Sequence, residues 1–83
     1  MVADGPVTIA PGGTAKLRTG LALAIPQGYV GLVCARSGMA CKRGLAPANK
    51  VGVIDADYRG ELMVALYNHS GEKRVVECGD RIA

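Results

Sequence analysis

The stretch that decides the fold is GVIDADYRGEL, residues 52–62. It begins with the apolar residues Val53 and Ile54, continues through two carboxylates two residues apart, and reaches a glycine near its end. A short apolar run that ends in such a polar cluster predicts a strand entering a tight turn or hairpin. The glycines at both ends allow the backbone to bend, or a ligand to approach it closely.

The polar part of this stretch has two interpretations. Asp, Gly and Arg in a turn usually mean only a hairpin with solvated charges. The same residues also suit a ligand site, in which Asp55 is a base, Tyr58 a flat ring and Gly60 bare backbone. The chain has three tyrosines and no Trp or Phe, so an aromatic ring beside two acids is informative here. Taken alone, the stretch slightly favours the solvated turn.

A second informative stretch lies upstream. Residues 29–35, YVGLVCA, form the most continuous apolar run and predict a core strand. This run opens directly into Arg36, Ser37 and Gly38. Backbone amides gathered at such a bend can form an anion-binding nest, to which Ser adds a hydroxyl donor and Arg a planar fork of donors. A helix that begins at Ser37 as its N-cap and runs through Lys42 fits the same residues equally well.

Length and composition bound the fold and the class of ligand. Eighty-three residues make one domain at most, and a chain this short buries only roughly 60% of its unfolded surface, so a small all-β domain often depends on a partner subunit. With 49% hydrophobic and 20% charged residues, the chain is globular rather than disordered. The net charge of +3 is spread along the chain without a basic tail or aromatic platform, which indicates a small anionic ligand rather than nucleic acid.

The cysteines and the start of the chain indicate a location. Cys34, Cys41 and Cys78 are odd in number and show no Cys-x-x-Cys spacing, so they predict neither a zinc site nor a disulfide framework. We interpret them as reduced, mostly buried side chains of a cytoplasmic protein. Residues 1–6 do not read as a signal peptide, and no apolar run approaches the roughly 20 residues that a membrane span needs.

The remaining pattern is one of short strands between Gly- and Pro-containing turns. Residues 61–68 are the clearest strand, with Leu62, Val64 and Leu66 on one face. Residues 42–50 predict a loop or one short helical turn that Pro47 ends. Because no segment predicts a convincing helix, the fold class is all-β, a sandwich or barrel. Further strands are expected over residues 7–10, 14–25 with a possible break at Gly20, 73–77, and from 81 to 83.

Taken together, several segments resemble the trimeric deoxyuridine triphosphatase (dUTPase) family. The segments ARSGMA at 35–40, residues 52–61 and GDRIA at 79–83 match the order and spacing of that family's second, third and fourth motifs, and Asn49 matches as well. The resemblance implies a distorted jelly roll (β-clip) fold and a homotrimer. It also implies hydrolysis of dUTP to dUMP and pyrophosphate with Mg²⁺, which supplies dUMP and keeps uracil out of DNA.

The resemblance assigns the binding of the phosphates and of the base. The phosphates would be held by the hydroxyl of Ser37, the amide of Gly38 and the charge of Arg36. The uracil edge would be read by Asn49 and by the backbone near Val53, Ile54 and Met63.

The resemblance also assigns the sugar contact and the base of the reaction. Tyr58 would pack on the deoxyribose and leave no room for a 2′-hydroxyl. Asp55 would orient and deprotonate the water that attacks the α-phosphorus, as in-line attack on phosphorus requires. Alternation along an extended chain puts Asp55 and Asp57 on one face, so spacing alone does not separate the two carboxylates.

Some parts of the family pattern are missing. The first motif, whose Asp belongs to the metal site, and the Gly-rich C-terminal arm have no match, and the fourth motif ends at Ala83. We therefore expect residues 1–83 to be a single dUTPase-like domain cut short at both ends. No metal ligand is assigned in this chain, although Mg²⁺ is normally held by one or two carboxylates plus substrate phosphates.

Three other functions are weighed against this one. The dCTP deaminases share the fold and trimer, but they carry a catalytic Glu where this chain has Ala65, and favour Arg-Ser-Ser over Arg-Ser-Gly. A non-catalytic nucleotide-binding module would fit the missing motifs, but it has no need of the water-activating Asp55. A purely structural β-domain would make the grouping of Arg36, Asn49, Asp55 and Tyr58 a coincidence.

Overall fold

The computed structural model describes residues 1–83 and confirms the all-β fold class. Seven short strands and one five-residue helix follow one another along the chain. In order they are β1 (Val7–Ile9), β2 (Thr14–Arg18), β3 (Gly31–Val33), the helix η1 (Gly38–Lys42), β4 (Leu45–Pro47), β5 (Gly52–Ile54), β6 (Met63–Asn68) and β7 (Arg74–Val76). No helix is both long and apolar enough to span a membrane.

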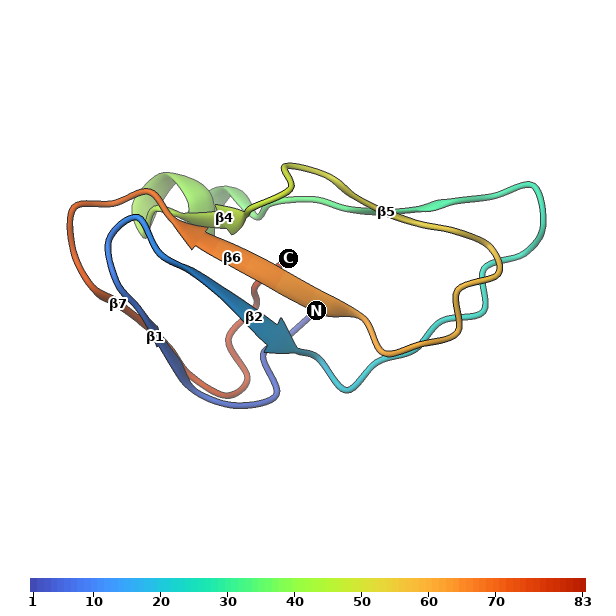
Figure 1. Ribbon diagram of the computed structural model, residues 1–83, viewed down its shortest axis with the longest axis horizontal. Helices are drawn as coiled ribbons and strands as arrows, with labels where there is room; N and C mark the ends of the chain where they lie inside the picture. The colour runs from blue at the N-terminus through green and yellow to red at the C-terminus, as the bar shows by residue number, and fades with distance from the viewer.

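The strands form three small antiparallel sheets. The central sheet has the order β2-β6-β4, and β1-β7 and β3-β5 form two-stranded ribbons. In Figure 1, β2 and β6 cross the middle of the molecule, the β1–β7 ribbon lies at one end, and the segment with β5 extends toward the other. This extension gives the chain its elongated shape, 42 × 21 × 18 Å.

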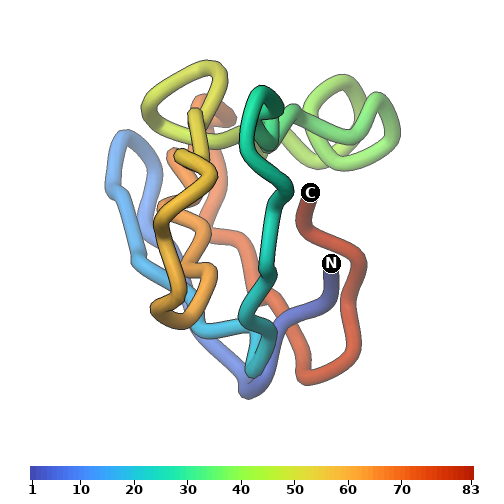
Figure 2. The backbone as a smooth tube through the Cα atoms, turned by 90° about the vertical axis from the view of Figure 1, so that its right-hand side faces the viewer, coloured from blue at the N-terminus to red at the C-terminus, as the bar shows by residue number.

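The core lies under the central sheet and the β1–β7 ribbon. Val64 and Leu66 alternate with exposed or half-buried neighbours along β6, as the period of a one-sided strand requires, and Leu62 before them is also buried. This confirms the predicted face of residues 61–68. The two chain ends lie side by side in Figures 1 and 2, where the Met1 amino group donates to the Ala83 carbonyl at 3.0 Å.

Two predictions about elements are wrong or too long. The strand predicted over residues 14–25 ends at Arg18, because the chain then turns at Gly20, whose φ is +72°. The segment predicted as a loop contains β4, which tolerates Pro47 because it is an edge strand whose last residue is the proline. The helix η1 follows the alternative interpretation of the second stretch, in which Ser37 is the N-cap of a helix that runs through Lys42.

The predictions of burial for residues 29–35 and for the cysteines are also wrong. Only Gly31–Val33 of the apolar run forms a strand, and Tyr29, Val30 and Leu32 are each at least 60% exposed. The three cysteines are free but exposed rather than buried. An apolar sequence predicts burial, but it does not say whether the chain's own core provides it.

Candidate functional site

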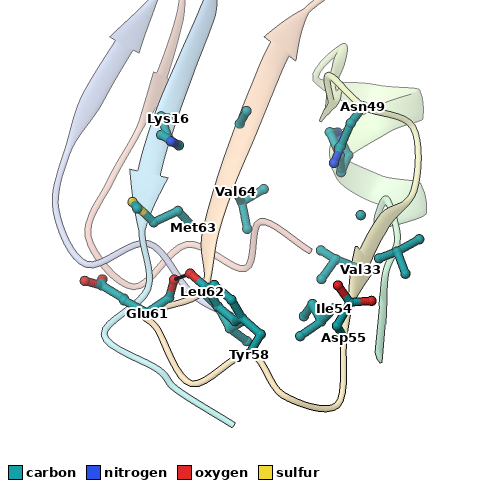
Figure 3. A pocket seen from close by; sticks show the side chains of 14 residues that line it. Lys16, Val33, Asn49, Ile54, Asp55, Tyr58, Glu61, Leu62, Met63 and Val64 are labelled. Atoms are coloured by element: carbon teal, nitrogen blue, oxygen red, sulfur yellow. Dashed lines mark hydrogen bonds between the residues drawn. The ribbon is translucent and has the colours of Figure 1, made fainter. Parts of the chain in front are cut away.

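A pocket of about 300 Å³ opens between β5 and the start of β6 (Figure 3). Asn49 and Asp55 border it on one side, and Lys16, Met63 and Tyr58 on the other. Its lining includes six of the nine residues that the sequence predicts for the substrate: Asn49, Val53, Ile54, Asp55, Tyr58 and Met63.

Unpaired strand edges border this pocket. β5 pairs only with β3, so its second edge has no neighbouring strand. β4 pairs with β6 only from Leu66 to Asn68, and the Ala48 amide adds one bond to the Ala65 carbonyl. Before Ala65, the edge of β6 that faces away from β2 therefore has no strand beside it. Backbone groups on such edges are the donors and acceptors that can pair with the edge of a flat heterocycle.

A turn over residues 47–51 sets the position of Asn49. Lys50 donates to the Pro47 carbonyl at 3.0 Å and adopts a φ of +69°. The side-chain nitrogen Nδ2 of Asn49 lies only 3.3 Å from where a Cβ of Gly52 would be. The lack of a side chain at Gly52 thus lets the amide group lie close against the start of β5.

The turn after β5 separates the two carboxylates that sequence spacing could not. The Tyr58 amide donates to the Asp55 carbonyl at 3.1 Å, and the Arg59 side chain donates to the Ala56 carbonyl at 2.6 Å. In this turn Asp55 lines the pocket, whereas Asp57 does not. Both are exposed, so both carboxylates reach water.

The Tyr58 ring folds back over the backbone of the same turn. Its hydroxyl donates to the Glu61 carbonyl at 2.8 Å. A Cβ on Gly60 would lie 2.7 Å from that hydroxyl oxygen and 2.9 Å from the ring carbon that bears it. The ring therefore occupies space that only glycine leaves free.

An ion pair ties the end of this turn to β2. The Arg18 guanidinium donates to both carboxylate oxygens of Glu61, at 2.8–3.2 Å, and the Gly20 amide donates to one of them at 3.1 Å. These bonds hold the pKa of Glu61 below its ordinary value of 4.5, and those from Arg18 have a larger effect than the one from Gly20. Beside them, Thr19 donates to the Leu62 carbonyl at 2.6 Å.

The other three predicted residues lie in a second pocket. Arg36, Ser37 and Gly38 line it where the chain enters η1, together with Arg43 and the segment 79–81. Ser37 precedes the helix, as the alternative interpretation required, but its side chain makes no capping hydrogen bond. This leaves its hydroxyl free for another acceptor.

Asp80 orders the second pocket from the opposite side. Its carboxylate accepts the Glu77 amide at 2.9 Å and an Arg43 bond at 3.3 Å. The hydrogen bond from the Glu77 amide lowers the pKa of Asp80, and the bond from Arg43 lowers it to a lesser degree. Since three arginines, Arg36, Arg43 and Arg81, line a pocket with this single acid, its chemistry suits an anion.

The linings of the two pockets share no residue. One chain therefore presents the carboxylate of Asp55 in one pocket and the Arg36–Ser37–Gly38 loop in another. Nor do the residues form a metal cage, because no group of three or more His, Cys, Asp and Glu side chains is placed to hold an ion. Near the first pocket, Glu61 is already paired with Arg18. These residues do not by themselves make the Mg²⁺ site that the resemblance implies.

Sequence reasoning missed several residues that line the two pockets. Lys16 and Glu61 belong to the first pocket, and Arg43 and Arg81 to the second. Arg18 and Glu61 lie 43 positions apart, so no local pattern joins them. Their opposite charges on two segments that were each predicted as a strand were the available signal.

The fold and site define a small all-β protein that carries one carboxylate-bearing cleft and one arginine-lined cleft. A family model described as dUTPase matches residues 1–83. The chain belongs to the dUTPase family.

Individual relatives agree with the family model. The chain is 57% identical over 81 residues to the deoxyuridine 5′-triphosphate nucleotidohydrolase of Desulfitobacterium hafniense (strain DSM 10664 / DCB-2), covering 96% of this chain and 54% of the relative. It is 52% identical over 80 residues to the protein of the same name from Syntrophotalea carbinolica, with the same coverage. The chain thus spans about half the length of the curated relatives it matches.

A solved structure agrees in fold. The crystal structure of dUTPase from Streptococcus mutans superposes with a TM-score of 0.91 at 28% identity, over 99% of this chain and 69% of that chain. This agreement is consistent with the jelly-roll-like architecture that the resemblance implied.

Proposed function

We propose that this chain carries the catalytic residues of a dUTP diphosphatase, which hydrolyses dUTP to dUMP and pyrophosphate. The observation that supports this most strongly is the first pocket. There Asn49 from one turn, and Asp55 and Tyr58 from another, line one cavity beside unpaired strand edges. A base-reading amide, a carboxylate and an aromatic ring are the groups that a nucleoside phosphate would require.

The nucleoside would bind along the open strand edges. The amide of Asn49 and the backbone near Val53, Ile54 and Met63 would pair with the uracil edge, which presents alternating donors and acceptors. Tyr58 would pack against the deoxyribose, where an added 2′-hydroxyl would meet the ring. A rigid ring that excludes this hydroxyl would separate dUTP from UTP.

Asp55 would act as the general base. It would accept a proton from a water molecule whose oxygen attacks the α-phosphorus in line with the leaving group. The bond between the α-phosphorus and the oxygen bridging to the β-phosphorus breaks, pyrophosphate leaves, and the water oxygen stays in dUMP. Exposure of Asp55 to water supports this role, because a base must reach both the water and the phosphorus.

The phosphates would be held by the Arg36–Ser37–Gly38 loop of another copy of the chain. In one chain this loop lines a different pocket from Asp55. Exposed apolar side chains on the β3–β5 ribbon, Leu32 at 61% and Val53 at 63%, support self-association. We therefore propose a homotrimer whose sites are shared between copies of the chain. The proposed location of the protein is the cytoplasm.

The composite site has a direct test. Arg36→Ala and Asp55→Asn proteins, each inactive alone, are unfolded together and refolded as a mixture. Mixed trimers contain some sites with both residues intact, so hydrolysis returns if the residues act across copies. Absence of any recovered activity from mixed trimers of confirmed composition would contradict the composite site.

Deamination of a cytosine nucleotide is disfavoured by one residue of the pocket. Ala65 lines it at the position where the resemblance to dCTP deaminases would require a glutamate. A methyl group transfers no proton. The test is pyrophosphate release from dUTP, dCTP and UTP, with Mg²⁺ and again with EDTA, together with ammonia release from dCTP. We expect turnover of dUTP alone; ammonia from dCTP would overturn the proposal.

A further inference from the structure

The position of the Tyr58 ring is tied to the backbone of its own turn. Tyr58 is 43% exposed, and its hydroxyl donates to the Glu61 carbonyl. The underside of the ring rests on Gly60, where any Cβ would come within 2.7 Å of the hydroxyl oxygen. The position of the ring therefore depends on where the backbone of residues 60 and 61 lies.

That backbone is anchored to β2 by side chains. The Glu61 carboxylate receives two donors from Arg18 and one from the Gly20 amide. The next residue is fixed as well, because the Leu62 amide donates to the Leu21 carbonyl at 2.7 Å and its carbonyl accepts from Thr19. The Glu61 carbonyl thus sits between two anchored groups.

We infer that Glu61 and Arg18 are positioning residues for substrate specificity. They act through the Glu61 carbonyl, which fixes the position of the Tyr58 ring, and Gly60 leaves free the space in which the ring lies. This inference rests on the proposed function, since it assigns the ring a sugar to sense. The path runs from Arg18 to the Glu61 carboxylate, through the Glu61 backbone, to the Tyr58 hydroxyl. Neither Arg18 nor Glu61 needs to touch the reacting phosphorus.

The first experiment measures discrimination, the ratio of kcat/KM for dUTP to that for UTP. Glu61→Ala removes every hydrogen bond that the carboxylate accepts from Arg18 and Gly20, and is expected to lower discrimination by about 10-fold, the size of one modest specificity contact. The kcat for dUTP should change by less than about threefold, because Asp55 is untouched. Glu61→Gln keeps one acceptor oxygen, which can still accept from the Arg18 guanidinium, and should restore part of the discrimination.

Two further variants separate positioning from simple destabilisation. Gly60→Ala places a methyl group in the space that the ring occupies and should lower discrimination at least as much as Glu61→Ala. The matched control is Glu72→Gln, which weakens the Arg74–Glu72 ion pair of 3.4 Å elsewhere on the surface. The control should leave discrimination unchanged.

A second readout does not depend on activity. Nuclear Overhauser contacts between the Tyr58 ring and the Gly60 α-protons measure directly, in the free protein, whether the ring packs against Gly60. Tyr29 and Tyr67 are the internal references. The contacts should weaken in Glu61→Ala and persist in Glu61→Gln and Glu72→Gln.

The outcomes distinguish this inference from the proposed function. Undiminished ring contacts in Glu61→Ala would overturn the positioning role. Lost contacts with unchanged discrimination, in a protein that hydrolyses dUTP, would overturn the link to specificity. If the unmodified protein releases no pyrophosphate from dUTP, the proposed function and the specificity role fail together, while the ring contacts still decide the positioning role.

Discussion

Replacing Thr19 by valine tests how the turn beside the pocket is anchored. Thr19 is 7% exposed, and its hydroxyl donates to the Leu62 carbonyl at 2.6 Å and accepts the Leu21 amide at 3.2 Å. Valine has nearly the same shape, so packing is kept while both backbone groups lose their partner. The change therefore isolates two hydrogen bonds.

The expected magnitude follows from the exposure of the two groups. Leu62 is buried, so its carbonyl bears a full penalty, whereas Leu21 is 43% exposed and water can reach its amide. One buried unsatisfied group and one partly solvated group together cost about 2 kcal/mol of unfolding free energy. For a domain of this size that lowers Tm by roughly 8–16 °C.

The assay is urea unfolding followed by circular dichroism at one fixed protein concentration, because self-association would make stability depend on concentration. Thr8→Val is the matched control, since Thr8 lies exposed on β1 and the change should stay within about 0.5 kcal/mol. If Thr19→Val proved as stable as Thr8→Val, with an unchanged denaturant slope, the argument that these bonds anchor the turn would be refuted.

Three further predictions concern the ring, the pH dependence and the assembly. Tyr58→Ala should admit UTP, raising its kcat/KM relative to dUTP by roughly 10–200-fold, and steady-state kinetics with both nucleotides would show it. Because the pKa of Glu61 is lower in the folded than in the unfolded chain, its contribution to stability is present above about pH 4.5 and is lost as the pH falls through the folded value. Unfolding at pH 7 and pH 3.5 should therefore show a smaller loss on acidification for Glu61→Gln than for the unmodified protein, and equal losses would count against the pair. Leu32→Asp, which places a charge on the exposed apolar ribbon, should convert the proposed trimer to monomers in sedimentation, whereas Thr8→Asp should leave it assembled.

Strands with a one-sided pattern could be predicted from the sequence. Leu62, Val64 and Leu66 repeat every second residue, and that period fixed both the strand and its buried face. The strand β4 was missed because Pro47 usually ends regular structure, and only the tertiary fold shows that it sits at an edge. The helix η1 has five residues, too few for a helical period to be visible.

Burial was less predictable than secondary structure. The run containing Leu32 was expected in the core because its residues are apolar, yet a sequence does not distinguish an internal core from a surface covered by another chain. The exposed Cys34 belongs to the same segment and was misjudged for the same reason.

The site was predictable where its residues are local. The grouping of Asp55 and Tyr58 follows from a single turn, whereas the difference between Asp55 and Asp57 depends on how that turn bends. The separation of the Arg36 loop into a second pocket could not be predicted, because it depends on the course of the folded chain from β3 into η1. The Arg18–Glu61 pair joins positions 43 residues apart and needed the fold to become visible.

The most direct test of the account is pyrophosphate release from dUTP by the Asp55→Asn and Asp57→Asn variants, measured beside binding of a non-hydrolysable dUTP analogue. We predict that Asp55→Asn lowers kcat by about 10²–10⁴-fold, the range for loss of a general base, while analogue binding stays within a few-fold. Asp57→Asn, on the same turn but outside the pocket, should keep nearly full turnover. Undiminished turnover by Asp55→Asn, or an equal loss in both variants, would contradict the assignment of Asp55 as the base.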